Sequence, residues 1–288
     1  MLKVASAILL VFSLALFQSC KPTAKPGPLK FNLKEGKEYE LQTDWNIIQQ
    51  LEGDTSTITM NNIYLLKVIR QQDSTATVKV TFGEMRNTMN VGGININSDT
   101  RVPFIDSTDG EFPLPSVMNH VFMGLKGKTF EMQVTGDGKV VSVNGLEQLE
   151  DAVVENAKTL KDAARVTYRE LFNANAMKER MNKVFFIYPV KQVNVGDTWT
   201  KQLDVSGFLY KSVYTVKSAT DNQLFLSLAG KADKPGSNAT IEQAGSLVVD
   251  AESGMIINAL IDQHTISMYE GKKDIMKNTI TVNGSTRK

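Results

Sequence analysis

Apolar and polar residues alternate along several stretches of the chain, with the period of two that marks a strand with one buried face. The first clear stretch runs from Tyr39 to Trp45, and others cover 58–69 and 76–82. Polar turn residues separate these stretches at 53–54 and 71–74. The pattern predicts an antiparallel meander with one face in water.

The alternation weakens between Gly83 and Pro115, where we expect one short strand ending near Asp99 and then a loop. Residues 116–126 take a helical spacing, and Gly127 is a suitable stop. The pair Asp137-Gly138 between two β-branched runs predicts a hairpin. Apolar residues then keep helical spacing from 146 to about 183, and this region ends before 190.

The second half of the chain repeats features of the first. Gly196-Asp-Thr-Trp199 has the form of Gly36-Lys-Glu-Tyr39, and the turn at Glu-Ser-Gly254 has the form of the turn at 137–138. These echoes suggest that one β unit is used twice, and chance similarity between short strands is the alternative. We therefore expect an α+β fold, mainly antiparallel β, with two similar curved β-meander units joined by a helical block, after a signal peptide and a flexible tether. The expected segments are a signal peptide at 1–19, a lipid-anchored flexible tether at 20–35, the first β unit at 36–145, the helical block at 146–189 and the second β unit at 190–288.

The chain begins with the pattern of a short export signal. Lys3 precedes an uninterrupted run of apolar and small residues from 4 to 17, which is shorter than the roughly 20 residues that span a bilayer. The run leads into Phe17-Gln-Ser19-Cys20, which resembles the bacterial lipobox. This resemblance implies cleavage between Ser19 and Cys20 and a lipid on Cys20, the single cysteine of the chain. The alternative is an ordinary secretory signal beside an incidental cysteine.

The residues after Cys20 predict a tether and suggest an address. Three prolines and a glycine lie between Cys20 and Lys30, so this stretch is unsuited to helix or sheet. It holds no acidic residue. In lipoproteins of the Bacteroidota, acidic residues just after the lipid-bearing cysteine resemble a cell-surface address. Their absence favours the periplasmic side of the outer membrane.

Composition limits the chemistry that the chain can perform. Of its residues 42% are apolar and 22% charged, which is ordinary for a globular body. Because Lys3 is the one charge in residues 1–19, the remaining chain carries 31 basic and 31 acidic residues. A net charge of zero provides no electrostatic basis for binding nucleic acid. With one cysteine and two histidines we predict no metal site and no cofactor.

Three stretches resemble an uncharacterised lipoprotein family of the Bacteroidota, a domain of unknown function. They are Gly-Asp-Thr-Trp199, the Asp-Gly138 hairpin followed by Val-Asn-Gly145, and Phe-Phe-Ile-Tyr-Pro189. These motifs are structural, and the family has no assigned activity. The resemblance therefore implies fold, anchor and lineage alone.

No motif of the chain predicts a catalytic group. His120 has no second histidine at helical spacing, and the neighbouring Ser116 lacks the Gly-x-Ser-x-Gly turn of a nucleophile. His264 lies in a predicted strand. The acidic loop residues are spaced unlike a calcium loop, so a solvated loop is the simpler interpretation of Asp106, Asp109 and Glu111. We predict that the protein is not an enzyme.

Four large side chains are candidates for lining a ligand cavity: Trp45, Trp199, Met177 and Met181. The aromatic residues open or lie in predicted strands, and the methionines share a predicted helix. Ordinary core packing is the competing interpretation for all four.

Three functions are compatible with these observations. The first is a membrane-anchored periplasmic binding module without catalysis, for a lipid or another apolar ligand. The second is a protein-interaction subunit of an outer-membrane complex, which would bind an envelope protein through exposed strand edges and the loop 99–115. The third is a hydrolase that uses carboxylates alone, which would need two carboxylates facing each other across a cleft.

The anchor gives a first testable prediction. Cys20→Ser should leave the body folded, because one cysteine forms no internal disulfide, and should move the protein out of the membrane fraction. Fractionation of cells followed by immunoblotting measures this. A variant that remained in the membrane fraction would refute the lipid anchor.

Overall fold

The computed structural model describes residues 28–102, 114–155, 157, 160–269 and 272–287. Cys20 and the signal segment lie outside these residues, as do Asp106, Asp109 and Glu111 of the acidic loop. The described chain is an α+β protein that is mainly antiparallel β, with four short helices. The helices are α2 (Leu114–Leu125), α3 (Glu150–Glu155), α4 (Lys161–Leu171) and α5 (Ala174–Phe185).

Twelve strands form one antiparallel sheet in the described part of the chain. Those of the first half are β1 (Glu38–Leu51), β2 (Asp54–Gln72), β3 (Thr75–Val91), β4 (Ile94–Asp99), β5 (Thr129–Thr135) and β6 (Val140–Asn144). Those of the second half are β7 (Thr198–Val205), β8 (Phe208–Ala219), β9 (Gln223–Asp233), β10 (Thr240–Asp250), β11 (Ile256–Tyr269) and β12 (Lys272–Thr286). The order across the sheet is β6-β5-β3-β2-β1-β12-β11-β10-β9-β8-β7, and β4 pairs with β3.

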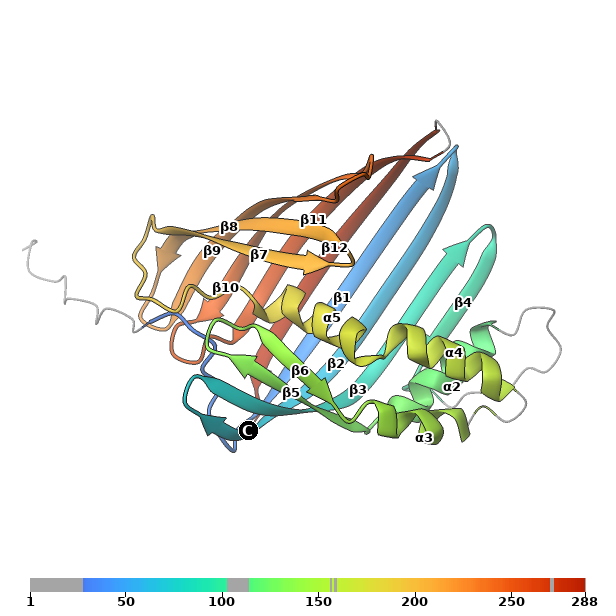
Figure 1. The fold of residues 1–288 in the computed structure, drawn as a ribbon, viewed down its shortest axis with the longest axis horizontal. Helices are drawn as coiled ribbons and strands as arrows, with labels where there is room; N and C mark the ends of the chain where they lie inside the picture. Colours follow the sequence, from blue (N-terminus) through green and yellow to red (C-terminus); the bar gives the residue numbers. More distant parts are fainter. Residues whose placement is uncertain (1–27, 103–113, 156, 158–159, 270–271, 288) are drawn as a thin grey trace, which may run out of the picture.

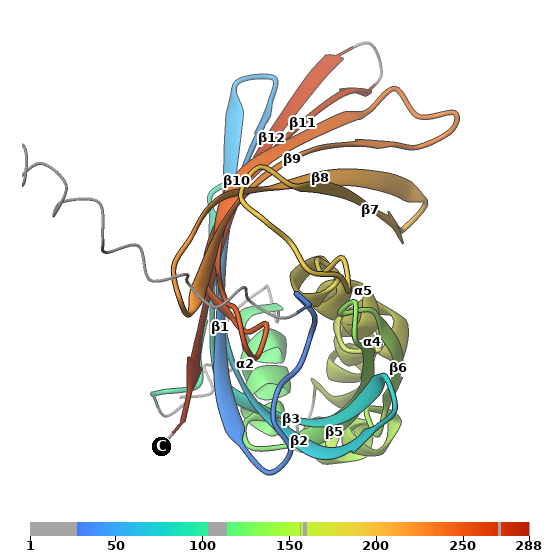
Figure 2. The same ribbon diagram turned by 90° about the vertical axis from the view of Figure 1, so that its left-hand side faces the viewer.

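The sheet is strongly curved, and the helices lie on its concave side (Figures 1 and 2). Seen end-on, β7 and β8 curl over α5 from one side, while β3, β5 and β6 curl beneath the helices from the other. The aromatic core lies between the sheet and the helices. Phe82 of β3 contacts Phe130 of β5 and Phe172 after α4, with ring centroids 5.2 and 5.8 Å apart. Burial of such aromatic surface is the main force that holds helices to sheet.

Strand β3 continues further than the sequence pattern indicates. The alternation weakens at Gly83, yet the strand runs on to Val91. Its partner β2 has a β-bulge between Asn62 and Tyr64, and a Cβ on Gly83 would lie 2.9 Å from the carbonyl oxygen of Ile63. A bulge opposite a glycine bends both strands without ending them. The bend turns the second half of β2 and the first half of β3, which pair with each other, beneath the helices (Figure 2).

The first described residues belong to the folded body, which corrects part of the tether predicted for 20–35. Leu29, Phe31 and Leu33 are buried, because their alternating apolar side chains enter the core. Leu29 forms an antiparallel bridge with Lys191, and the backbone N–H of Phe31 donates to Gly136 at 2.8 Å. The folded body therefore begins by Leu29 and not at Gly36.

Two chain segments, one at 31–32 and one at 188, donate hydrogen bonds to both of the hairpin turns at 136–138 and 253–254. The Asn32 N–H donates to the carbonyl oxygen of Ser253 at 2.8 Å, one residue after the contact of Phe31 with Gly136. Tyr188 donates its backbone N–H to Asp137 and its hydroxyl to the carbonyl oxygen of Gly254. These bonds close one end of the molecule.

The two halves repeat several backbone hydrogen bonds. The N–H of Gly36 donates to Val68 at 2.9 Å, and that of Gly196 donates to Val216 at 2.8 Å. Gly36 precedes β1 and bonds to β2, which pairs with β1. Gly196 precedes β7 and bonds to β8, which pairs with β7.

Gly138 tests the closed end of the molecule. Its φ of +84° disfavours a side chain, and a Cβ there would overlap the carbonyl oxygen of Phe185. Gly138→Ala should lower the free energy of unfolding by at least about 3 kcal/mol, from backbone strain together with overpacking. Gly93→Ala is the control, since Gly93 has a φ of +80° with open space around it, and should lose about 1–2 kcal/mol. Urea unfolding measures both, and equal losses would show that the contact with Phe185 is unimportant.

Candidate functional site

A groove of about 550 Å³ lies between the concave face of the sheet and the helices. Its sheet wall comes from β1 to β4, and its helical wall from α2, α4, α5 and the residue after α4. Most of the lining side chains are apolar. They include Trp45, Ile47, Ile58, Met60, Met89 and Ile96 on the sheet and Met118, Phe122, Leu171, Phe172 and Ala176 on the helical side.

The strand register explains why the sheet wall is apolar. Ile47 of β1 pairs with Ile58 of β2, which pairs with Met89 of β3, and Met89 pairs with Ile96 of β4. Directly paired residues in neighbouring strands project from the same face of the sheet. One row of four apolar side chains therefore crosses four strands, and the parallel row that contains Trp45 and Met60 lies beside it.

The same row becomes polar on the other side of β1. Ile47 pairs with Asn278 of β12, and the row continues through Gln263, Gln243 and the position of Ser212. Asn278 donates to Gln263 at 3.2 Å, Gln263 donates to Gln243 at 3.1 Å, and Gln243 donates to Ser212 at 2.5 Å. This row of the concave face is therefore amphipathic, and its apolar and polar parts meet at the junction of β1 and β12. The neighbouring row stays apolar across the junction, where Trp45 pairs with Ile280.

A glycine makes the polar row continuous. Gly230 of β9 lies between Gln243 and Ser212 in the register. A Cβ on Gly230 would lie 2.6 Å from the Nε2 atom of Gln243, so its absence lets the glutamine cross the strand to reach Ser212.

Lys183 of α5 lies where the apolar and polar parts meet. Its side chain lines the groove and also two smaller cavities, of about 50 and 20 Å³. The ammonium nitrogen lies 5.7 Å from the ring centroid of Trp45 and 5.7 Å from that of Tyr210. Burial lowers the pKa of Lys183, and the nearby Arg180 acts in the same direction while Glu179 opposes it. No ion pair joins Lys183 to a carboxylate in the described part of the chain.

The four ligand candidates from the sequence have separate positions. Trp45 lines the groove. Trp199 is buried, stacks on Tyr214 with centroids 5.7 Å apart, and donates its indole N–H to Ile187. Met177 and Met181 are buried in the core. Of the four, Trp45 is the one placed at the groove.

The positions of the two histidines do not suggest a catalytic or metal-binding role. His120 is buried in α2, and His264 lies on β11. Among the described residues no group of three or more histidine, cysteine and acidic side chains is placed to hold a metal ion.

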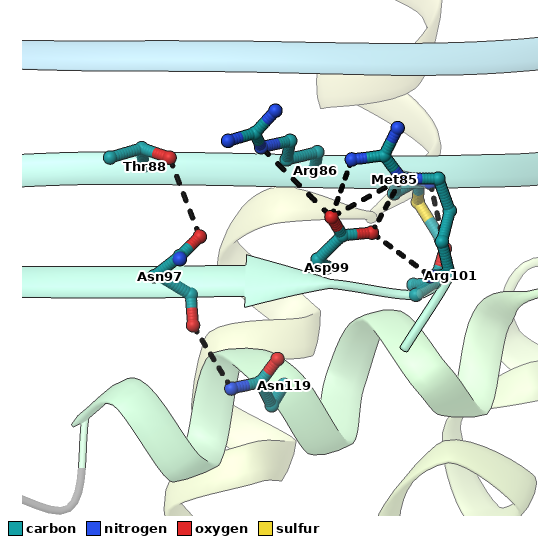
Figure 3. A network of polar contacts seen from close by, with 8 residues as sticks. Met85, Arg86, Thr88, Asn97, Asp99, Arg101 and Asn119 are labelled. Atoms are coloured by element: carbon teal, nitrogen blue, oxygen red, sulfur yellow. Dashed lines mark hydrogen bonds and ion pairs between the residues drawn. The ribbon is translucent and has the colours of Figure 1, made fainter. Parts of the chain in front are cut away.

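A polar network fixes the wall of the groove formed by β4 and α2 (Figure 3). Asn119 of α2 donates to the carbonyl oxygen of Asn97 at 3.2 Å. Asp99 accepts three side-chain bonds from Arg101, at 2.6, 2.9 and 3.2 Å, and forms an ion pair with Arg86 at 4.0 Å. The network ties the end of β4 to β3 and to the helix that follows it, which keeps Ile96 facing the groove.

The network predicts a dependence of stability on pH. Hydrogen bonding from Arg101 lowers the pKa of Asp99 to about 2, against burial, which raises it. A depressed carboxyl pKa stabilises the fold above the ordinary value of 3.8, and this contribution is lost as the pH falls through about 2. Asp99→Asn should therefore reduce the free energy of unfolding at pH 7, and the deficit should shrink between pH about 4 and 2.

Urea unfolding of wild type and Asp99→Asn across this range measures the deficit. Asp233→Asn is the control, because Asp233 is exposed and forms no ion pair with another described residue. A deficit that stayed constant down to pH 2 would mean that the Asp99 charge does not support the wall.

The sequence and structure were compared with known proteins. A model of a family of unknown function, DUF6263, matches residues 73–265. A comparison with curated proteins found no match. None of the helices in the described residues is both long and apolar enough to cross a bilayer.

Solved structures show distant likeness only. The translocator domain of the autotransporter NalP from Neisseria meningitidis aligns over 97% of each chain, with 7% identity and a TM-score of 0.29. DynF of the dynemicin biosynthesis pathway of Micromonospora chersina covers 93% of this chain and 88% of its own, with 6% identity and a TM-score of 0.21. A DUF1329 protein from Desulfovibrio piger covers 85% and 83%, with 7% identity and a TM-score of 0.17. Scores this low do not indicate a shared fold.

Proposed function

The chain belongs to DUF6263, a family of unknown function, and we propose that it is a lipid-anchored binding module that takes an apolar ligand into the groove between sheet and helices. The groove is the observation that carries this proposal. Its volume of about 550 Å³ falls within the range of about 300–1,000 Å³ that is usual for ligand sites.

The groove wall suits a lipid-like molecule. Isoleucine, methionine and phenylalanine supply most of the apolar lining, and methionine adapts to ligands of different shape. An apolar ligand there would cover the side chains of one row across β1 to β4. Such side chains bury a ligand and do not react with it, so we propose binding without catalysis.

The proposed location follows from the start of the chain. Ser19-Cys20 ends an export signal of the lipoprotein type, and no acidic residue follows before Lys30. We propose that the lipid on Cys20 anchors the body to the outer membrane on its periplasmic side. The membrane and an apolar ligand are then the two partners of the protein.

We also propose that the sheet is built from two similar units, 36–145 and 190–288, joined by the helical block. Three features support this proposal. The bonds of Gly36 and Gly196 to the adjacent strand correspond, and the hairpin turns at 136–138 and 253–254 have glycines with φ of +84° and +73°. Each hairpin also receives a backbone bond from the crossing segment at 31–32.

Occupation of the groove can be tested with Nile red, a neutral dye that fluoresces in apolar surroundings. The chain from residue 20 onward, carrying Cys20→Ser and lacking the apolar run at 4–17, allows the titration without detergent. We expect saturable binding of the dye. Ala176→Trp should weaken binding by at least about tenfold, because Ala176 lines the groove and an indole there would fill it.

Asn175→Trp is the matched control, because Asn175 is exposed on the same helix and does not line the groove. It should bind the dye as the parent chain does, and thermal melting should show that both variants are folded. Equal binding by the two variants, or no saturable binding by the parent chain, would refute the proposal.

A further inference from the structure

We infer that the ligand of the groove is a single-chain amphiphile with an anionic head, and that Lys183 binds the head while the tail lies along the apolar row of β1 to β4. This inference rests on the proposed function and adds the chemical class of the ligand. It is carried by the position and contacts of Lys183 on the concave face of the sheet.

The Lys183 ammonium is directed into the groove by two aromatic rings. Trp45 of β1 and Tyr210 of β8 each have their centroid 5.7 Å from the nitrogen. A ring face attracts a cation but leaves it without a counter-ion. The charge is therefore held in place and still able to pair with an anion that enters the groove.

Other cations of the same region are already paired or engaged. Lys201, which lines the neighbouring small cavity, forms an ion pair with Asp137 at 3.2 Å. Arg180 lies over the ring of Phe172 at 5.6 Å and donates to the carbonyl oxygen of Leu171 at 3.2 Å. Lys183 differs from Lys201 in having no ion pair with a described carboxylate.

The acidic side chains of the groove do not compensate Lys183 directly. Glu170 and Glu179 are the two that line it. Glu179 accepts bonds from the backbone N–H and the hydroxyl of Ser206 at 3.4 and 3.1 Å, which engage it in the turn between β7 and β8. Glu170 forms no ion pair with Lys183. Glu179 acts on the pKa of Lys183 from a distance, and an anionic ligand would supply the direct ion pair that neither glutamate forms.

Burial opposes the positive charge of Lys183. Burial lowers the pKa of Lys183, so the charged form is disfavoured in the folded state. A group of this kind makes the fold less stable at neutral pH than an apolar side chain of the same size would. A ligand anion would turn this unfavourable charge into a favourable pair.

The surface around Lys183 matches an amphiphile in its two parts. On one side lie Ile47 and Ile58 of the apolar row, and on the other lie Gln263 and Gln243 of the polar row. A tail placed along the apolar row would extend toward Ile96 and Phe122, away from the polar row. The head would then meet the ammonium at the boundary.

The test compares two ligands that differ in charge at the head, hexadecanoate and hexadecanol, as competitors of Nile red. The chain from residue 20 onward, carrying Cys20→Ser, is the parent. Lys183→Met should weaken competition by hexadecanoate by about tenfold or more, the usual worth of a hydrogen-bonded charge pair, and leave competition by hexadecanol nearly unchanged. Lys183→Arg should restore most of the affinity for hexadecanoate, because it keeps the charge.

Lys178→Met is the matched control, since Lys178 lies on the same helix and does not line the groove. It should compete with both ligands as the parent does. Thermal melting at pH 7 should show Lys183→Met to be at least as stable as the parent, because the substitution removes a buried cation.

Each outcome decides between the two proposals. If hexadecanol competes and hexadecanoate does so no better, or if Lys183→Met weakens both equally, the inference fails and the apolar groove stands. If neither ligand displaces the dye from the parent chain, the proposed function fails and the inference fails with it.

Discussion

The pairing of β1 with β12 is the constraint on which the rest of the structure depends. It joins residues 39–51 to residues 274–286, so the first and last strands of the chain meet in the middle of the sheet. Bringing together segments so distant in sequence costs considerable chain entropy. Without this pairing, the row of side chains that crosses the concave face would be interrupted between Ile47 and Asn278. The amphipathic face is therefore a property of the completed sheet.

The curvature of the sheet brings this face around the helices (Figure 2). The bulge opposite Gly83 bends β2 and β3 toward the helices, and the far strands β7 and β8 curl over α5 (Figure 2). A flat sheet would leave Lys183 at the surface of a helix. In the curved sheet it lies between rings from β1 and β8, strands that are far apart in the sheet order. A residue that reduces stability is often retained at a binding site because function requires it.

The sequence predicts the local elements well and the groove poorly. The alternation from Tyr39 to Trp45, the helix near 116–126 and the turn at Asp137-Gly138 all depend on near neighbours, and the structure contains each of them. The sequence does not single out Lys183, because on α5 it shares a face with Ala176 and Arg180, and this face has the composition of a solvated helix surface. Only the register of distant strands shows that a sheet covers this face. The same register separates Trp45 at the groove from Trp199 in the core.

If Cys20 carries the proposed lipid, the early entry of the chain into the folded body limits the distance between that body and the membrane. Leu29 is already bridged to Lys191, so a fixed point of the fold lies nine positions after Cys20. A fully extended chain covers at most about 3.6 Å per residue, so Leu29 can lie at most about 30 Å from Cys20. A body anchored through Cys20 would thus work within roughly one hydrocarbon-core thickness of the membrane surface. The chain enters the fold at the end closed by the two hairpin turns, so that end would stay nearest the bilayer. The long tips of β1 and β2 lie at the opposite end of the molecule (Figure 1).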